Sequence, residues 1–257
     1  MKYNGSMKFS ELISAGQTVA VIGGGGKTGL IEKLETALHE AGRPALVSVT
    51  TRLGREQLPH LARVEAGSPD EALAAAERAA RGERLLLAGP FKPDNLTLNK
   101  FSGLPPAWFP LVRRALGPEL SILVEADGSA GRPLKIHRAG EPAPPPGADR
   151  LIAVLGLSVL VRPWVGSVHR AADLPLLCPP GELPEENAPL RPAQVAAVLG
   201  AGWRGLRPDL IFLNQADLLK SESERSLGRD LMARLGSAGW PLLAGSLRDG
   251  CLGPEIR

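Results

Sequence analysis

Four consecutive glycines, Gly23–Gly26, stand directly before Lys27 and Thr28, between an apolar run and an amphipathic stretch. In a phosphate-binding loop, glycines turn backbone N–H groups onto phosphate oxygens, the lysine reaches the β and γ phosphates, and the hydroxyl binds Mg²⁺. The full pattern G-x-x-x-x-G-K-[ST] needs a glycine at Val21, so this loop is two residues short. The alternative is a plain strand-to-helix turn. We predict a shortened phosphate cradle at the helix start, formed by Gly23, Gly24, Gly25, Gly26, Lys27 and Thr28.

A pair of acidic residues follows the apolar run 121–124. Asp127 stands at the end of this predicted strand, where P-loop enzymes hold magnesium directly or through water. Glu125, two residues earlier, shares its face if the strand stays regular. We predict Thr28 and Asp127 as the metal-binding residues for Mg²⁺, and Lys27, Glu125 and Asp127 as the catalytic residues. The alternative is a pair of acids that only form a turn with the DGS segment.

Asn214 and Asp217 have the spacing with which GTPases read guanine. One carboxylate accepts from both N–H groups on the guanine edge, whereas adenine presents no such pair. Gln215 stands where the lysine of this pattern is usual, and Gly245 and Ser246 end the next apolar run, where GTPases often present a backbone N–H to the guanine oxygen. We therefore expect GTP or ATP as the cofactor, with GTP favoured. The alternative is an ordinary Asn/Asp turn at a strand end.

Other polar residues are less specific. Thr50 and Thr51 either sense the γ-phosphate or metal or simply close a strand with β-branched side chains. Cys178 is interpreted as an ordinary reduced thiol rather than a nucleophile or chalcogen carrier. Five basic side chains would either hold an anionic substrate or lie in solvated loops: Arg132, Lys135, His137, His169 and Arg170.

Apolar runs that alternate with helical patterns must position these residues. Strands are predicted at 18–23, 44–51, 84–89, 121–127, 150–157, 209–217 and 241–247, and helices at 27–41 and 71–81. The alternation implies βαβ units and a mainly parallel sheet, and the apolar middles fit strands covered on both faces. We expect an α/β, three-layer fold of the P-loop NTPase type. The proline-rich stretches 140–149 and 178–192 are predicted to be surface excursions.

Composition narrows the class of protein. The 257 residues, 44% of them hydrophobic, suit one domain over 7–257, and residues 1–6 are set aside as a tag or extension because NGS precedes a second methionine. The net charge of +3, with basic and acidic residues interspersed, does not indicate nucleic acid. The two cysteines, Cys178 and Cys251, match no metal-ligand spacing and suit a reducing compartment. The start MKYNGSMKFSELISAG goes straight to polar residues, unlike a secretory signal, so we expect a cytoplasmic protein. The longest apolar run, at 151–161, is about half of the ~20 residues that cross a bilayer and is predicted to be buried core, so no membrane contact is expected.

Several segments taken together resemble a known family. In chain order they are FSELISAGQTVAVIGGGGKTGL, VSVTT, LVEADGSAGRPLK, AVLGLSVL, VHR and FLNQADLL, and they are similar to the YqeC family of selenium-dependent molybdenum hydroxylase accessory proteins. The resemblance implies a P-loop nucleotide-binding protein in molybdenum or selenium cofactor maturation, with a molybdenum hydroxylase or its maturation factors as partner. Two positions depart from the family pattern: Gly29 replaces a threonine and Gln215 replaces a lysine.

Three functions stay open at this point. The chain is a nucleotide hydrolase whose γ-phosphate state drives a maturation partner, an ATP-dependent ligase or kinase, or a module that holds a nucleotide or cofactor without chemistry. The ligase or kinase alternative stays open because the short G-x-x-G-K-T loop also resembles that of Mur ligases. Product analysis separates the three functions: free phosphate alone, phosphate released only with an acceptor, or no turnover.

Overall fold

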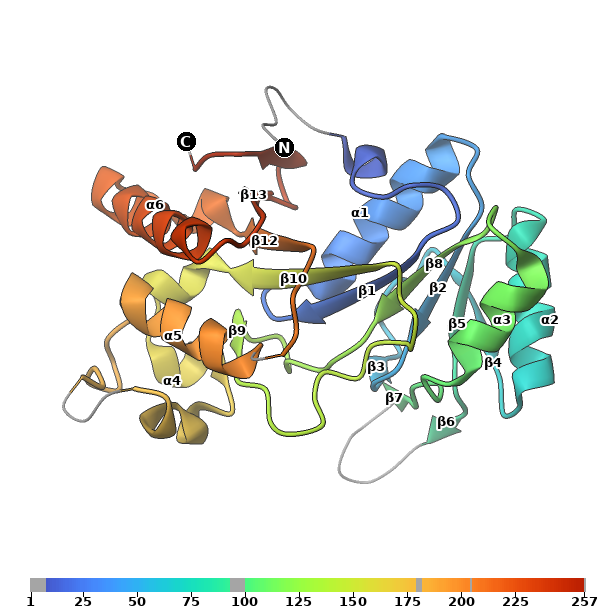
Figure 1. The fold of residues 1–257 in the computed structure, drawn as a ribbon, viewed down its shortest axis with the longest axis horizontal. Helices are drawn as coiled ribbons and strands as arrows, with labels where there is room; N and C mark the ends of the chain where they lie inside the picture. Colours follow the sequence, from blue (N-terminus) through green and yellow to red (C-terminus); the bar gives the residue numbers. More distant parts are fainter. Residues whose placement is uncertain (1–7, 93–99, 179–181, 204, 257) are drawn as a thin grey trace.

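A computed structural model of the chain describes residues 8–92, 100–178, 182–203 and 205–256, and the predicted extension 1–6 lies outside them. The central sheet has nine strands: β1 (Thr18–Gly23), β2 (Ala45–Val49), β4 (Ala62–Glu65), β5 (Leu85–Ala88), β8 (Ser121–Glu125), β10 (Arg150–Gly156), β12 (Leu210–Asn214), β13 (Leu242–Ser246) and β14 (Cys251–Gly253). Their order is β14-β13-β12-β10-β1-β8-β2-β5-β4, and β14 alone pairs antiparallel in this sheet (Figure 1). The mainly parallel α/β prediction is thereby confirmed.

Helices cover both faces of this sheet. α1 (Lys27–Glu40) packs on one face, and α2 (Pro69–Ala80), α3 (Trp108–Leu116), α5 (Pro192–Gly202) and α6 (Glu222–Ser237) pack on the other. Alternate residues of β1 show the reason, because Val19 and Val21 join Leu30 of α1 in one apolar cluster while Ala20 and Ile22 join the cluster under α5 and α6. A strand buried on both faces needs apolar residues at every position, and this explains the continuous apolar runs in the sequence.

Short elements surround the sheet. β3 (Leu53–Gly54), β7 (Lys100–Phe101) and β6 (Phe91–Lys92) form a small antiparallel sheet, and β9 (Leu134–Lys135) pairs in parallel with β11 (Val168–His169). The remaining turns of helix are η1 (Phe9–Glu11), η2 (Leu157–Leu160), α4 (Trp164–Ser167), η3 (Ala171–Leu176) and η4 (Ala216–Leu218). Two-residue strands carry no periodic signal, so the sequence did not predict them. The β9–β11 pair brings the basic segments 132–137 and 169–170 together.

The carboxyl ends of the parallel strands lie along one edge of the central sheet. The order of the strands determines where each motif lies along this edge. The glycine loop follows β1 at the centre of this edge. β8 and β2, with their acidic and threonine residues, lie on one side of β1, while β10, β12 and β13 lie on the other. Ligands of open α/β sheets bind outside such carboxyl ends, where the strand order reverses. The candidate residues therefore meet at the expected edge.

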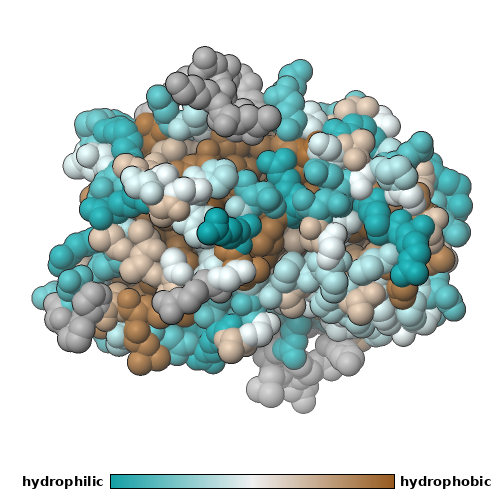
Figure 2. Space-filling model, in the orientation of Figure 1, coloured by the Kyte–Doolittle hydropathy of each residue, from teal (hydrophilic) through white to brown (hydrophobic). Residues whose placement is uncertain are grey.

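The surface is mixed in character. Figure 2 shows hydrophilic side chains spread over the visible face, with apolar areas between them. Large apolar side chains exposed on the described residues are Leu111, Val165, Leu176, Leu183 and Leu227. No helix among the described residues is long and apolar enough to span a bilayer.

Both cysteines are free thiols. Cys178 lies in the apolar cluster under α5 and α6, and burial together with the nearby charge of Glu182 raises its pKa. A raised pKa keeps the thiol protonated and unreactive. The geometry thus agrees with an ordinary thiol at Cys178, while Cys251 is exposed on β14.

Candidate functional site

The glycine loop adopts a conformation that other residues tolerate poorly. Gly23, Gly25 and Gly26 have φ angles of +94°, +78° and +130°. A Cβ atom at Gly23 would lie 2.2 Å from the carbonyl oxygen of Val154, and one at Gly26 would lie 2.4 Å from Nδ2 of Asn214. The run of glycines is therefore required by backbone conformation and by close packing of the loop against β10 and β12.

Part of the loop's hydrogen-bonding capacity is used inside the chain. The first three glycines donate their amides to neighbouring groups: Gly23 to Oδ2 of Asp127 (2.9 Å), Gly24 to the carbonyl of Val154 (2.8 Å) and Gly25 to the carbonyl of Arg132 (2.9 Å). The first N–H groups of a helix have no acceptor within that helix. Leu30 donates the first hydrogen bond of the helix, to the carbonyl of Gly26, so the donors left for an anion are the amides of Gly26, Lys27, Thr28 and Gly29 and do not include the first three glycines of the predicted cradle.

Lys27 lies beside these donors and is almost completely buried. Its Nζ atom donates to the carbonyl of Gly23 (2.8 Å) and to Oγ of Ser129 (3.1 Å). The same atom lies 3.2 Å from Oδ1 of Asp127 and 3.8 Å from Oε1 of Glu125. A compact ammonium on a flexible stem is therefore held next to the cradle by two carboxylates.

Glu125 faces the hydroxyl of Thr28. Oγ1 of Thr28 donates to Oε2 of Glu125 at 2.7 Å, and Nε2 of Gln57 donates to the same hydroxyl at 3.0 Å. Burial raises the pKa of Glu125, although the charge of Lys27 and the Thr28 hydrogen bond act in the opposite direction. Asp127 makes no contact of this kind with Thr28. The geometry favours Glu125 over Asp127 as the partner of Thr28 at a metal.

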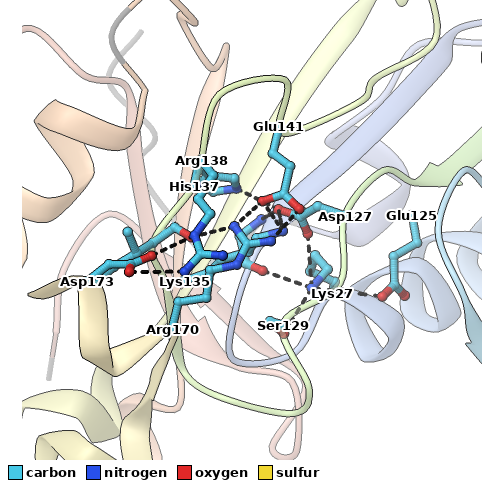
Figure 3. Close-up of polar contacts among 12 residues, drawn as sticks. Lys27, Glu125, Asp127, Ser129, Lys135, His137, Arg138, Glu141, Arg170 and Asp173 are labelled. Carbon is cyan, nitrogen blue, oxygen red and sulfur yellow. Dashed lines mark hydrogen bonds and ion pairs between the residues drawn. The ribbon is translucent and has the colours of Figure 1, made fainter. Parts of the chain in front are cut away.

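Asp127 is instead the centre of a buried charged cluster (Figure 3). Its Oδ2 atom accepts from the amide of Gly23, lies 2.7 Å from Nε2 of His137 and lies 3.6 Å from Nζ of Lys135. Burial alone raises the pKa of Asp127, but the His137 hydrogen bond and the charges of Lys27 and Lys135 outweigh it and lower the pKa to about 2. Asp127 is thus an internal anion that ties the glycine loop to β9.

The cluster continues to Arg170 (Figure 3). Nζ of Lys135 lies 3.3 Å from Oε2 of Glu141, and the guanidinium of Arg170 contacts both oxygens of the same carboxylate, with Nη2 2.6 Å from Oε1. Hydrogen bonds from Arg170 lower the pKa of Glu141 to about 2 against the effect of burial. The sequence singled out Lys135, His137 and Arg170 separately, and the fold brings all three into one network.

A pocket of about 1070 Å³ opens at this edge. It brings together the predicted residues Gly25, Gly26, Lys27, Thr28, Thr50, Thr51, Glu125, His169, Arg170 and Gln215. Other lining residues were not predicted from the sequence: Arg52, Gln57, Lys100, Ser129 and Glu141. Ser129 lies in the recognisable DGS segment, whereas Gln57 and Lys100 come from irregular or two-residue elements that give no sequence signal. Neither Asn214 nor Asp217 lines this pocket.

Asn214 links the glycine loop to the segment after β13. Its Nδ2 atom donates to the carbonyl of Gly25 at 2.7 Å, and its Oδ1 atom accepts from the amide of Leu247 at 3.0 Å. The buried asparagine therefore fixes the relative position of two loops. The amide of Leu247, next to the predicted Gly245 and Ser246, is occupied by this contact.

Asp217 and Gln215 follow β12 in different environments. Asp217 is partly exposed in η4 and makes no hydrogen bond or ion pair with a residue in the described part of the chain. Gln215 has a φ of +68°, and its Oε1 atom accepts from Oγ of Ser158 at 2.7 Å. The carboxylate at Asp217 is thus available to a ligand, whereas the residue that replaces the usual lysine is held against η2.

The donor set near Thr28 suits one kind of metal. The described residues contain no group of three or more His, Cys, Asp or Glu side chains that could hold a metal ion by themselves. Mg²⁺ is usually bound by one or two protein oxygens together with substrate phosphates and water. The Thr28 hydroxyl and the Glu125 carboxylate, side by side next to the free amides, fit Mg²⁺ bound with a nucleotide.

Comparison with known proteins identifies the family of the chain. No curated protein matches the chain. The family described as YqeC protein matches residues 19–172, which is more than half of the chain. The matched region contains the glycine loop, both acidic residues after the 121–124 run, and His169 and Arg170. Because this match covers more than half of the chain, the chain belongs to the YqeC family.

Proposed function

We propose that the chain binds a nucleoside triphosphate with Mg²⁺ and hydrolyses it, as an accessory factor in the maturation of a molybdenum hydroxylase. The proposal is carried by one observation: residues with free amides at the start of α1, the ammonium of Lys27 and the Thr28–Glu125 pair line the same pocket side by side. The accessory role, and any involvement of selenium, are drawn from the resemblance to the YqeC family.

Each group has a distinct task in this proposal. Phosphate oxygens accept from the amides of Gly26, Lys27 and Thr28, and the ammonium of Lys27 turns from Gly23 toward the β and γ phosphates. Thr28 and Glu125 would hold Mg²⁺, which neutralises charge on the phosphates when it is bound. Phosphoryl transfer needs positioning and charge stabilisation more than covalent help from the protein, and these side chains supply both.

Product analysis tests the proposal directly. GTP and ATP are each incubated with Mg²⁺ and the protein, and released phosphate is measured. Phosphate release without any added acceptor is expected. Release only with an acceptor would favour the ligase or kinase alternative, and binding without release would leave a nucleotide-holding module.

Glu125→Gln is expected to lower Mg²⁺-dependent turnover by about 100-fold or more, as for the loss of one group that stabilises transition-state charge. Nucleotide affinity in EDTA should change little, because the amide replaces a carboxylate that faces the metal. The matched control is Glu65→Gln, which alters another acid at the end of a strand, β4, outside the pocket. Normal hydrolysis by Glu125→Gln at saturating Mg²⁺ would exclude Glu125 from the metal site.

GTP is expected to bind at least several-fold more tightly than ATP. The carboxylate of Asp217 can pair with two donors on guanine and with none on adenine, and a polar group left unpaired on binding costs about 1–3 kcal/mol. Asp217→Asn replaces one acceptor by a donor, so affinity should move from GTP toward XTP, whose edge presents an oxygen there.

Competition of GTP, ATP and XTP against one labelled analogue measures this preference in wild type and Asp217→Asn. Asp230→Asn, an exposed acid of α6, serves as the control. Equal displacement by all three nucleotides in both proteins would contradict guanine recognition by Asp217.

A further inference from the structure

The lining of the pocket contains basic residues that the proposed nucleotide site does not use. Four of the pocket's lining residues, Arg52, Lys100, His169 and Arg170, have no task in nucleotide binding, and we call this part of the lining the basic end. Strands β12 and β13, which carry the candidate base-reading loops, lie on the opposite side of β1 from β2. A nucleotide that uses the free amides and Asp217 therefore extends away from β2, the strand that Arg52 follows.

The charges of the pocket favour an anion there. Four cationic side chains line it, Lys27, Arg52, Lys100 and Arg170, against the two carboxylates of Glu125 and Glu141. Lys27 and Glu125 lie beside each other and offset each other's charge, so the excess of positive charge comes from Arg52, Lys100 and Arg170 against Glu141. An uneven field of this kind attracts a small ligand of opposite charge.

Arg170 is held in a fixed position by the surrounding structure. Its backbone has a φ of +65°, which is uncommon for residues other than glycine. Such conformations persist where the surrounding structure imposes them. Both oxygens of Glu141 contact its guanidinium, and Glu141 is itself held by the buried ammonium of Lys135. A guanidinium presents several N–H donors in one plane, so a group anchored on one side can still donate to phosphate or carboxylate oxygens on another.

The same contacts connect the basic end to the phosphate cradle. Lys135 lies between Glu141 and Asp127, and Asp127 contacts both the amide of Gly23 and the ammonium of Lys27 (Figure 3). Arg170 thus has a defined position relative to the phosphate cradle, through alternating positive and negative groups.

We propose that the basic end binds a second, small ligand with a double negative charge, carried by one phosphate group or by two carboxylates. Its location beside the terminal phosphate rests on the proposed function, whereas its binding to Arg170 does not. This is also the place where the ligase or kinase alternative requires an acceptor. Arg170 and Arg52 would contact the anionic group, and Glu141 and Lys135 are positioning residues.

Calorimetric titration with inorganic phosphate and with malonate tests the inference, one probe for each anionic group. The titrations use the Lys27→Ala protein, in which the phosphate cradle is weakened. At least one probe should still bind, and adding Arg170→Met should weaken it by about tenfold or more, as expected for loss of charge-assisted hydrogen bonds. Arg138→Met is the matched control, because Arg138 also pairs with a carboxylate, that of Asp173, but lies outside the pocket. Arg52→Ala is the second test variant, since this exposed side chain can be removed without disturbing the core.

The outcomes separate this inference from the proposed function. If neither probe binds Lys27→Ala, or if Arg170→Met and Arg52→Ala bind the probes as well as Arg138→Met does, the basic end is not an anion site. That result leaves nucleotide binding untouched. Conversely, loss of probe binding on Arg170→Met in a protein that binds no nucleotide would support the anion site and contradict the proposed function.

Discussion

Lys27→Ala abolishes the binding of GTP and ATP in a protein that remains folded. Hydrogen bonds to charged groups contribute about 1.5–3 kcal/mol each, so loss of an ammonium that reaches two phosphates should weaken binding by about 100-fold or more. The variant also leaves the buried carboxylates of Glu125 and Asp127 without the cation that lies between them. Isothermal calorimetry of both nucleotides measures the effect.

Lys33→Ala is the control for this experiment. Lys33 lies on the same helix but is exposed and outside the pocket, so its loss should preserve affinity. Circular dichroism and thermal melting establish that Lys27→Ala is folded. Undiminished affinity of that folded variant for both nucleotides would remove the phosphate cradle from the proposed function.

Asp127→Asn is expected to lower the free energy of unfolding by about 3 kcal/mol or more, as for a buried ion pair that loses one partner. The amide keeps the shape and can still accept from Gly23, but Lys27 and Lys135 then lose the carboxylate between them. Urea unfolding followed by fluorescence measures the change. Asp173→Asn is the control, because Asp173 pairs with the exposed Arg138 and surface ion pairs contribute little.

The same variant distinguishes two roles for Asp127. The sequence predicts that it binds Mg²⁺, in which case Asp127→Asn should depress metal-dependent turnover far more than nucleotide affinity. The contacts in the structure instead favour a role in holding the glycine loop and Lys27. Unchanged stability combined with a collapse of Mg²⁺-dependent turnover would restore Asp127 as the metal ligand and contradict the loop-holding role.

The sequence by itself determined the fold class, because its signals are local and repeated. Strands buried on both faces require continuous apolar runs, and β1, β2, β5, β8, β10, β12 and β13 all arise from the predicted runs. The spacing of Leu30, Leu34 and Leu38 predicts the buried face of α1. The order of the motifs along the chain also sufficed to place the glycine loop, the acids and Asn214 at carboxyl ends of parallel strands.

Only the tertiary structure decided which groups meet at that edge. Glu125 is the last residue of β8, and Asp127 lies beyond it, where the alternation of a strand no longer sets the direction of a side chain. The two carboxylates consequently point to different partners, Thr28 and the cluster of Lys135 and His137. The pairing of β9 with β11 likewise joins segments more than thirty residues apart. No local sequence pattern predicts such a long-range contact.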